Sequence, residues 1–186
     1  MICDFKQDFS FSLGTRQDMD MDLLMQCIPN CIEVRKTDAE DDKRGIDYIA
    51  RLDHGAFLNI DAKARRAGSK PYWTQGEPEL ALEIWSVMPK DGKTGKAGWT
   101  CSRSSDVDLI LYTFDKTEWN KFYLFPFQHL RMAFQHNYRT WAKTWKPRMQ
   151  DNKGWTSQAI FVPASVVIKA VADEMTHSIA AKERLC

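Results

Sequence analysis

Three charged side chains between residues 45 and 63 have the types and spacing needed for metal-assisted hydrolysis. Asp47 precedes one short apolar run, and Asp61 and Lys63 end the next, two residues apart. Two carboxylates held close together repel unless a cation lies between them or one of them stays protonated. Hard oxygen ligands suit Mg²⁺ or Mn²⁺, which polarises a phosphoryl oxygen and lowers the pKa of a bound water. A nearby lysine would orient that water or offset charge that develops on phosphorus.

The same segment reads as a β-hairpin that would bring the two aspartates together. A three-residue loop over 53–55 ends in glycine, which takes positive φ without a steric penalty. In that register Asp47 falls directly opposite Asp61, and one face of the hairpin is continuously apolar. Lys63 lies two residues beyond Asp61 and therefore on the same face. The apolar face would consist of Tyr48, Ala50, Leu52, Ala56, Leu58 and Ile60.

The elements around the hairpin predict an α/β protein with a mixed sheet. Apolar residues at helical spacing predict a helix over 17–28, which Pro29 ends. Two later strands run through Pro126 and Pro163 into helices, because proline suits the first helical turn. Alternating or branched runs predict strands over 31–37, 80–87, 106–114, 121–125 and 159–162. The stretches 89–98 and 150–154 read as loops.

Length and composition restrict the class of protein. The 186 residues fit a single domain, 1–186, and a hydrophobic fraction of 44% is ordinary for a globular chain. The apolar runs are too short to cross a bilayer, and the N-terminus lacks the pattern of an export signal. The five scattered cysteines suit reduced thiols better than disulfides or a zinc site. These features predict a cytoplasmic protein without a membrane partner.

The hairpin resembles the core of the PD-(D/E)XK nuclease superfamily, which includes restriction endonucleases, resolvases and phage or repair exonucleases. The family pattern is an acid on one core strand and acid-x-lysine on the next, here Asp47 and then Asp61-Ala62-Lys63. A helix precedes the pair and strand-helix units follow it, as in the family. Ile46 stands where the motif name has proline. The resemblance implies a restriction-endonuclease-like fold, which is a mixed central sheet flanked by helices.

The resemblance also implies a function, namely hydrolysis of phosphodiester bonds in DNA with Mg²⁺ or Mn²⁺. Asp47, Asp61 and the backbone carbonyl of Ala62 would bind the metal, and Lys63 would be catalytic. Compact single-domain members of the superfamily are common in phages, so a phage or prophage origin is implied. RNA as a substrate and a homodimer as the active form are left open.

A third acidic ligand often comes from the first helix or an adjoining strand in this family. Glu83 is the first candidate, because it lies in the middle of a predicted strand, where an unpaired carboxylate would be costly to bury. A solvent-facing side chain would explain Glu83 equally well. Asp18, Asp22 and Glu33 compete for the same role.

Basic residues follow the hairpin and recur further along the chain beside tryptophans. Arginine and lysine bind phosphates, and unpaired bases stack on aromatic rings, so these residues are candidates for DNA contact. Tryptophans near a helix end fit a packed core equally well. The basic candidates are Arg65, Arg66, Lys70, Lys143, Lys146 and Arg148.

Other functions compete with the nuclease. A catalytically inactive nuclease-like protein would bind DNA or a protein partner, for example as an inhibitor of a host defence system. The intact Asp47, Asp61 and Lys63 argue against it. A charged, solvated hairpin face would explain the same residues without any chemistry. A small-molecule hydrolase or transferase would need a nucleophile elbow or a P-loop, and the sequence contains neither motif.

Overall fold

In the computed structural model, the chain forms two compact units. The residues that it describes are 16–38, 40–41, 44–65, 73–74, 77–92, 94–102, 106–114 and 122–183. One unit consists of Met1–Ala67 and Ser104–Pro126, and the other of Gly68–Arg103 and Phe127–Cys186. Within these residues the chain forms three helices and two sheets, one of them mixed, so the α/β prediction is confirmed. The single domain stays a prediction.

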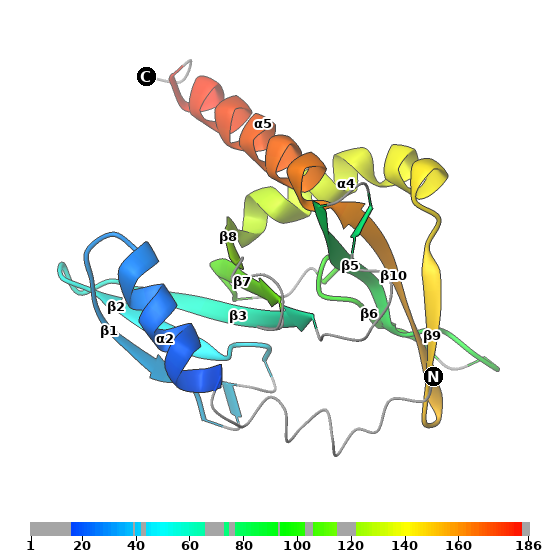
Figure 1. The fold of residues 1–186 in the computed structure, drawn as a ribbon, viewed down its shortest axis with the longest axis horizontal. Helices are drawn as coiled ribbons and strands as arrows, with labels where there is room; N and C mark the ends of the chain where they lie inside the picture. The colour runs from blue at the N-terminus through cyan, green and yellow to red at the C-terminus, as the bar shows by residue number, and fades with distance from the viewer. Residues whose placement is uncertain are drawn as a thin grey trace. The chain divides into compact units, whose positions relative to one another are not determined.

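The first unit is a five-stranded mixed sheet with one helix. Strand β2 pairs antiparallel with both β1 and β3, β7 pairs in parallel with β3, and β8 pairs antiparallel with β7. The helix α2 lies against β1 and β2 (Figure 1). The elements are α2 (Arg16–Cys27), β1 (Cys31–Lys36), β2 (Tyr48–Leu52), β3 (Phe57–Arg65), β7 (Leu109–Phe114) and β8 (Phe122–Pro126).

The apolar face of the β2–β3 hairpin forms the core of this unit together with α2. Tyr48 pairs with Ile60 and Ala50 with Leu58, which confirms the predicted register. One buried cluster joins these strands to the helix, and each fully buried leucine or isoleucine stabilises the fold by about 1.5–3 kcal/mol. Its members are Leu24, Ile28, Tyr48, Ala50, Ile60 and Leu111. The opposite face is thereby left to the odd-numbered residues of the hairpin.

The loop 53–55 closes the hairpin as predicted. Gly55 has a φ of 86°, in the left-handed region that favours glycine. Its N–H donates to the Leu52 carbonyl at 2.9 Å, and the Leu52 N–H donates to the Ala56 carbonyl at 2.9 Å. These bonds fix the loop length and therefore the register of both strands.

The second unit is an antiparallel sheet with two helices. Its strand order is β4-β5-β10-β9, and β6 pairs with β5. The helix α5 packs against β5, β10 and α4 (Figure 1). The strands are β4 (Trp73–Thr74), β5 (Glu77–Val87), β6 (Lys96–Ala97), β9 (Arg148–Asn152) and β10 (Trp155–Pro163), and the helices are α4 (Phe127–Thr144) and α5 (Ala164–Glu183).

The predicted strand-helix units are confirmed, whereas both predicted loops contain a strand. Pro126 ends β8 directly before α4, and Pro163 ends β10 directly before α5. Residues 150–152, expected in a loop, belong to β9, which pairs with β10. The expected loop 89–98 contains the two-residue strand β6, which pairs with β5. The strands expected in one sheet are divided between two. Among the described helices, none is long and apolar enough to cross a membrane.

Gly55 offers a test of the hairpin. Gly55→Ala should lower the free energy of unfolding by about 1–2 kcal/mol, because an L side chain is strained at this φ. A Cβ at this position would meet no atom within 4 Å, so packing adds nothing to the cost. Gly55→Asn is the matched control and should lose less, since asparagine tolerates the left-handed region. Urea unfolding measures both variants, and equal stability of Gly55→Ala and the parent would contradict the loop geometry.

Candidate active site

The hairpin register brings Asp47 and Asp61 together. Asp47 directly precedes β2, and its N–H donates to the carbonyl of Ile60 at 2.8 Å. Tyr48 pairs with Ile60, so Asp47, the residue before it, lies next to Asp61 at the start of the hairpin. The charge of Asp47 raises the pKa of the Asp61 carboxyl, as expected of two acidic side chains that lie close together. This supports the predicted proximity of the two aspartates, whereas their projection from one face stays a prediction.

Asp47 also binds the backbone of the neighbouring strand. Its Oδ2 accepts a hydrogen bond from the N–H of Ala62 at 2.7 Å. In a strand, the N–H and C=O of one residue point to the same side, so the Ala62 carbonyl faces the edge at which Asp47 lies. β2 begins only at Tyr48, so the side chain of Asp47 takes the place of a strand partner at this point. The edge thus presents carboxylate and carbonyl oxygens together.

Asp61 is the electrostatic centre of the site. It is 5% exposed, and the Nζ of Lys63 lies 2.6 Å from its Oδ1. The pKa of Asp61 is raised to about 7, chiefly by burial; the positive charge of Lys63 opposes this rise, and the charge of Asp47 adds to it. At neutral pH the Asp61 carboxyl is therefore near its titration midpoint. A divalent cation would favour the ionised form of both carboxyl groups.

The donor set fits a hard divalent cation. Asp47, Asp61 and the Ala62 carbonyl offer oxygen ligands only, which suit Mg²⁺ or Mn²⁺. In the part of the chain that the structure describes, no group of three or more His, Cys, Asp or Glu side chains is placed to hold a metal. Two carboxylates are nevertheless sufficient for Mg²⁺, which commonly keeps several waters and takes further ligands from substrate phosphates.

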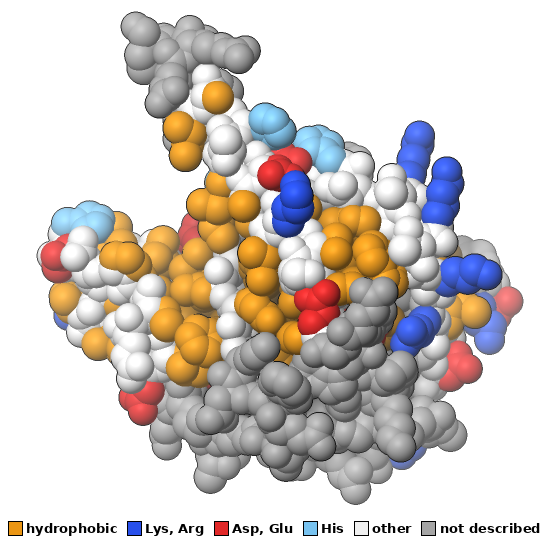
Figure 2. Space-filling model, turned by 45° about the horizontal axis from the view of Figure 1, so that its top comes forward, with side chains coloured by type: hydrophobic (Ala, Val, Ile, Leu, Met, Phe, Trp, Pro, Cys, Tyr) orange, Lys and Arg blue, Asp and Glu red, His pale blue; other side chains and the backbone are white. Residues whose placement is uncertain are grey.

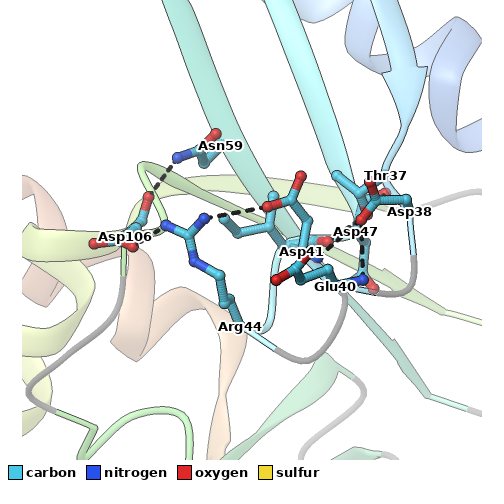
Figure 3. A network of polar contacts seen from close by, with 9 residues as sticks. Thr37, Asp38, Glu40, Asp41, Arg44, Asp47, Asn59 and Asp106 are labelled. Atoms are coloured by element: carbon cyan, nitrogen blue, oxygen red, sulfur yellow. Dashed lines mark hydrogen bonds and ion pairs between the residues drawn. The ribbon is translucent and has the colours of Figure 1, made fainter.

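The loop between β1 and β2 is tied to the segment before β7 (Figure 3). The guanidinium of Arg44 binds Asp41 at 3.2 Å and also binds the carboxylate of Asp106. The side chain of Asn59 donates to the Asp106 carbonyl at 2.9 Å. This network anchors the chain shortly before Asp47 enters the hairpin, so it restricts where that carboxylate lies. Local patterns in the sequence do not predict these contacts between distant segments.

Glu83, the candidate third ligand, lies on β5 in the second unit. Its Oε2 accepts hydrogen bonds from the Ser86 hydroxyl at 2.6 Å and from the Trp99 N–H at 3.3 Å. The Thr100 hydroxyl also donates to its backbone carbonyl. Bonds within its own unit therefore account for this carboxylate, and its role as a ligand stays a prediction.

The other acidic candidates for a third metal ligand lie on α2 and β1 of the first unit. Asp22 is exposed on α2, and Glu33 binds Arg51 at 2.8 Å, while the side chain of Asp18 lies outside the described part. Asp20, which the sequence reading missed, is 5% exposed and accepts a hydrogen bond from the Tyr48 hydroxyl at 3.2 Å. It lies on the core side of the sheet, because Tyr48 belongs to the core cluster.

The basic candidates lie in different parts of the chain. Arg65 is half-buried on β3, on the face of Lys63. Lys143, Lys146 and Arg148 are exposed at the end of α4 and the start of β9. The guanidinium of Arg148 lies 5.0 Å from the ring centroid of Phe161. Two further candidates, Arg66 and Lys70, lie outside the described residues.

Comparisons of the chain with models of protein families, with curated proteins and with solved structures found no match.

The raised pKa of Asp61 predicts a pH-dependent stability. Because the folded pKa of about 7 exceeds the unfolded value of about 3.9, the stabilisation is complete below pH 4 and is lost as the pH rises through 7. In metal-free buffer, the parent should therefore lose free energy of unfolding between pH 5 and pH 8, and Asp61→Asn should lose less. Urea unfolding across this range measures the difference.

The exposed Asp22 provides the control for this experiment, because it lies on α2 of the same unit. Asp22→Asn should keep the pH dependence of the parent. An Asp61→Asn variant with an unchanged pH dependence would show that Asp61 does not titrate as described.

Proposed function

We propose that the chain is a divalent-metal-dependent nuclease of the PD-(D/E)XK type that hydrolyses phosphodiester bonds in DNA. The observation that carries the proposal is the buried carboxyl group of Asp61, which Lys63 binds and beside which Asp47 lies at the start of the same hairpin. A solvated charged face would explain three exposed residues, but Asp61 is 5% exposed. Burying one carboxyl group beside another costs free energy, and such pairs are typical of functional sites.

The order of the elements supports a restriction-endonuclease-like fold. The helix α2 precedes the hairpin, and the β8–α4 and β10–α5 units follow it, in the order that the family pattern requires. The acid-x-lysine segment lies in β3, next to β2, the strand that Asp47 directly precedes. We therefore include this fold in the proposal. The spacing of the cysteines supports a cytoplasmic location, and Cys27, Cys31 and Cys101 are free thiols.

Each site residue has a role that follows from its position. Asp47 and Asp61 would bind the metal through carboxylate oxygens, and Ala62 through its carbonyl. The metal would polarise the phosphodiester and supply a water of lowered pKa. Lys63, whose ammonium already reaches the Asp61 carboxylate, is placed to bind a phosphate oxygen or the attacking water. Asp47 also holds the Ala62 backbone through its second oxygen, which fixes the edge of the site.

A basic surface of the second unit supports a nucleic acid as the substrate. Lysine and arginine side chains gather where α4 ends and β9 begins (Figure 2). Trp155, 38% exposed, follows directly on β10. Cations of this kind bind phosphates with a strong dependence on salt. The exposed basic residues of this surface are Arg139, Lys143, Lys146, Arg148 and Lys153.

The inactive binding protein is the second candidate, and one contact favours it. Lys63 donates to Asp61 at 2.6 Å and so offsets part of the negative charge without any metal. A protein that has lost catalysis could keep this ion pair for stability alone. The nuclease needs the carboxylates of Asp47 and Asp61 both for metal binding and for cleavage. The inactive binding protein does not cleave DNA.

Two substitutions separate these functions. Asp61→Asn and Lys63→Ala should each reduce cleavage of labelled DNA by at least about a hundredfold, because each removes a group that acts on the reacting phosphate. Mn²⁺ affinity should fall in Asp61→Asn but stay equal or rise in Lys63→Ala, since deleting a positive charge favours the cation. Gel assays with Mg²⁺, Mn²⁺ or EDTA measure cleavage, and calorimetry measures the affinity.

Exposed residues of the same charge serve as controls. Asp22→Asn on α2 and Lys36→Ala on β1 should leave both cleavage and Mn²⁺ affinity at the level of the parent. Undiminished cleavage by Asp61→Asn or Lys63→Ala would refute the assignment. A parent that binds DNA but cleaves no substrate with either metal would favour the inactive binding protein.

A further inference from the structure

The face that carries the two aspartates continues along the hairpin to a row of exposed side chains. Residues of β3 alternate between faces, so Phe57 lies on the same side as Asp61. In the register of the three strands, Phe57 pairs with Arg51, and Arg51 pairs with Glu33. These three side chains therefore form one row across β3, β2 and β1, towards the closed end of the hairpin.

Exposure increases along this face from the site to that row. Asp61 is 5% exposed, Asn59 is half-buried, and Phe57 is 60% exposed. An aromatic ring that is this exposed on a paired strand is held in place by the backbone ladder but lacks a packing partner for most of its surface. Such a ring offers a fixed platform for a flat ligand, and nucleobases stack on rings of this kind.

Arg51 adds a cation beside the ring. Its Nε donates to the carboxylate of Glu33 at 2.8 Å, and its side chain is 45% exposed. In the described part of the chain, this bond to Glu33 engages the Nε of the guanidinium group. Arg35, exposed on β1, faces the same side one row nearer to the aspartates, because it pairs with Ile49. Guanidinium groups bind phosphate oxygens. The ring of Phe57 therefore suits the base of a nucleotide, and the two arginines suit its phosphate.

The neighbours of Phe57 argue against a protein partner on this face. A protein docks on contiguous apolar surface, whereas the row of Phe57 otherwise contains Arg51 and Glu33. Ile32, 46% exposed, lies in the irregular part of β1 between the paired residues 31 and 33. An isolated ring among charged groups fits stacking better than apolar docking.

We propose that this row, Phe57 with Arg51 on the site face of β1–β3, binds an unpaired strand of nucleic acid next to the cleavage site. The inference rests on the proposed nuclease function and specifies the form of its substrate. Phe57 precedes Asp61 by four residues, so the two lie about 13 Å apart along β3. At about 3.4 Å per nucleotide, this distance corresponds to about four nucleotides of a DNA strand. A base can reach the face of a ring only when it is not paired and stacked within a duplex. The preferred substrate is therefore single-stranded DNA, or a single-stranded end or flap.

Fluorescence anisotropy with EDTA tests this surface without cleavage. The parent should bind a labelled oligothymidine more tightly than a duplex of equal length. Phe57→Ala should weaken binding of the oligothymidine roughly tenfold and leave duplex binding unchanged, because it removes one stacked base. Phe57→Tyr should bind like the parent. Ile32→Ala, which removes a comparably exposed apolar side chain outside the row, is the control and should also bind like the parent.

The charged members of the row give an independent readout. Arg51→Gln should weaken binding and lower the salt dependence of log K by about one phosphate contact. Glu33→Gln should strengthen binding, since it removes the negative charge beside Arg51 while keeping a hydrogen-bond acceptor. Unchanged affinity in both Phe57→Ala and Glu33→Gln would overturn the proposal, as would a parent that binds no oligonucleotide.

The outcome also distinguishes this inference from the nuclease proposal. Cleavage by the parent together with unchanged affinity of Phe57→Ala would overturn the strand-binding row and leave the nuclease intact. Binding that depends on Phe57, in a parent that neither cleaves DNA nor binds Mn²⁺, would support the row and refute the hydrolysis.

Discussion

The arrangement of the site depends on one constraint, the pairing register of the β2–β3 hairpin. Gly55 takes a positive φ and sets the loop length, so Tyr48 pairs with Ile60 and the apolar face packs against α2. Because side chains alternate between the faces of a strand, a slip of one residue would bury charges and expose the core. The same energetic preference that packs the core therefore holds Asp47 opposite Asp61. Core stability and site geometry are two consequences of one register.

This register creates an electrostatic conflict that the surroundings only partly relieve. Asp61 is buried beside Asp47, and its pKa rises to about 7 although Lys63 binds it. Asp47 is satisfied on one oxygen by the N–H of Ala62. Burial and the charge of Asp47 oppose ionisation of Asp61, whereas Lys63 favours it. This arrangement is expected where a bound cation or substrate supplies further positive charge. Within our account, the metal completes the site, and the exposed row around Phe57 leads the substrate strand to it.

The sequence predicted the hairpin well, because local pattern and loop length determine its geometry. It predicted β9 poorly, since Arg148–Asn152 is polar and mostly exposed and therefore lacks the alternation of a half-buried strand. Asp20 was missed although it is spaced four and eight residues from Leu24 and Ile28, on the buried side of α2. The contacts of Glu83 and the division into two sheets depend on pairings between distant segments, which local patterns do not contain.

If Asp47 and Asp61 share one divalent ion, anomalous diffraction from crystals grown with Mn²⁺ will locate that ion. We expect one strong peak within coordination distance of both carboxylates and of the Ala62 carbonyl, about 2.0–2.3 Å from the oxygens. The peak should disappear from crystals of Asp47→Asn. A hairpin with no peak between the carboxylates at saturating Mn²⁺, in which Lys63 still binds Asp61, would refute the shared metal site.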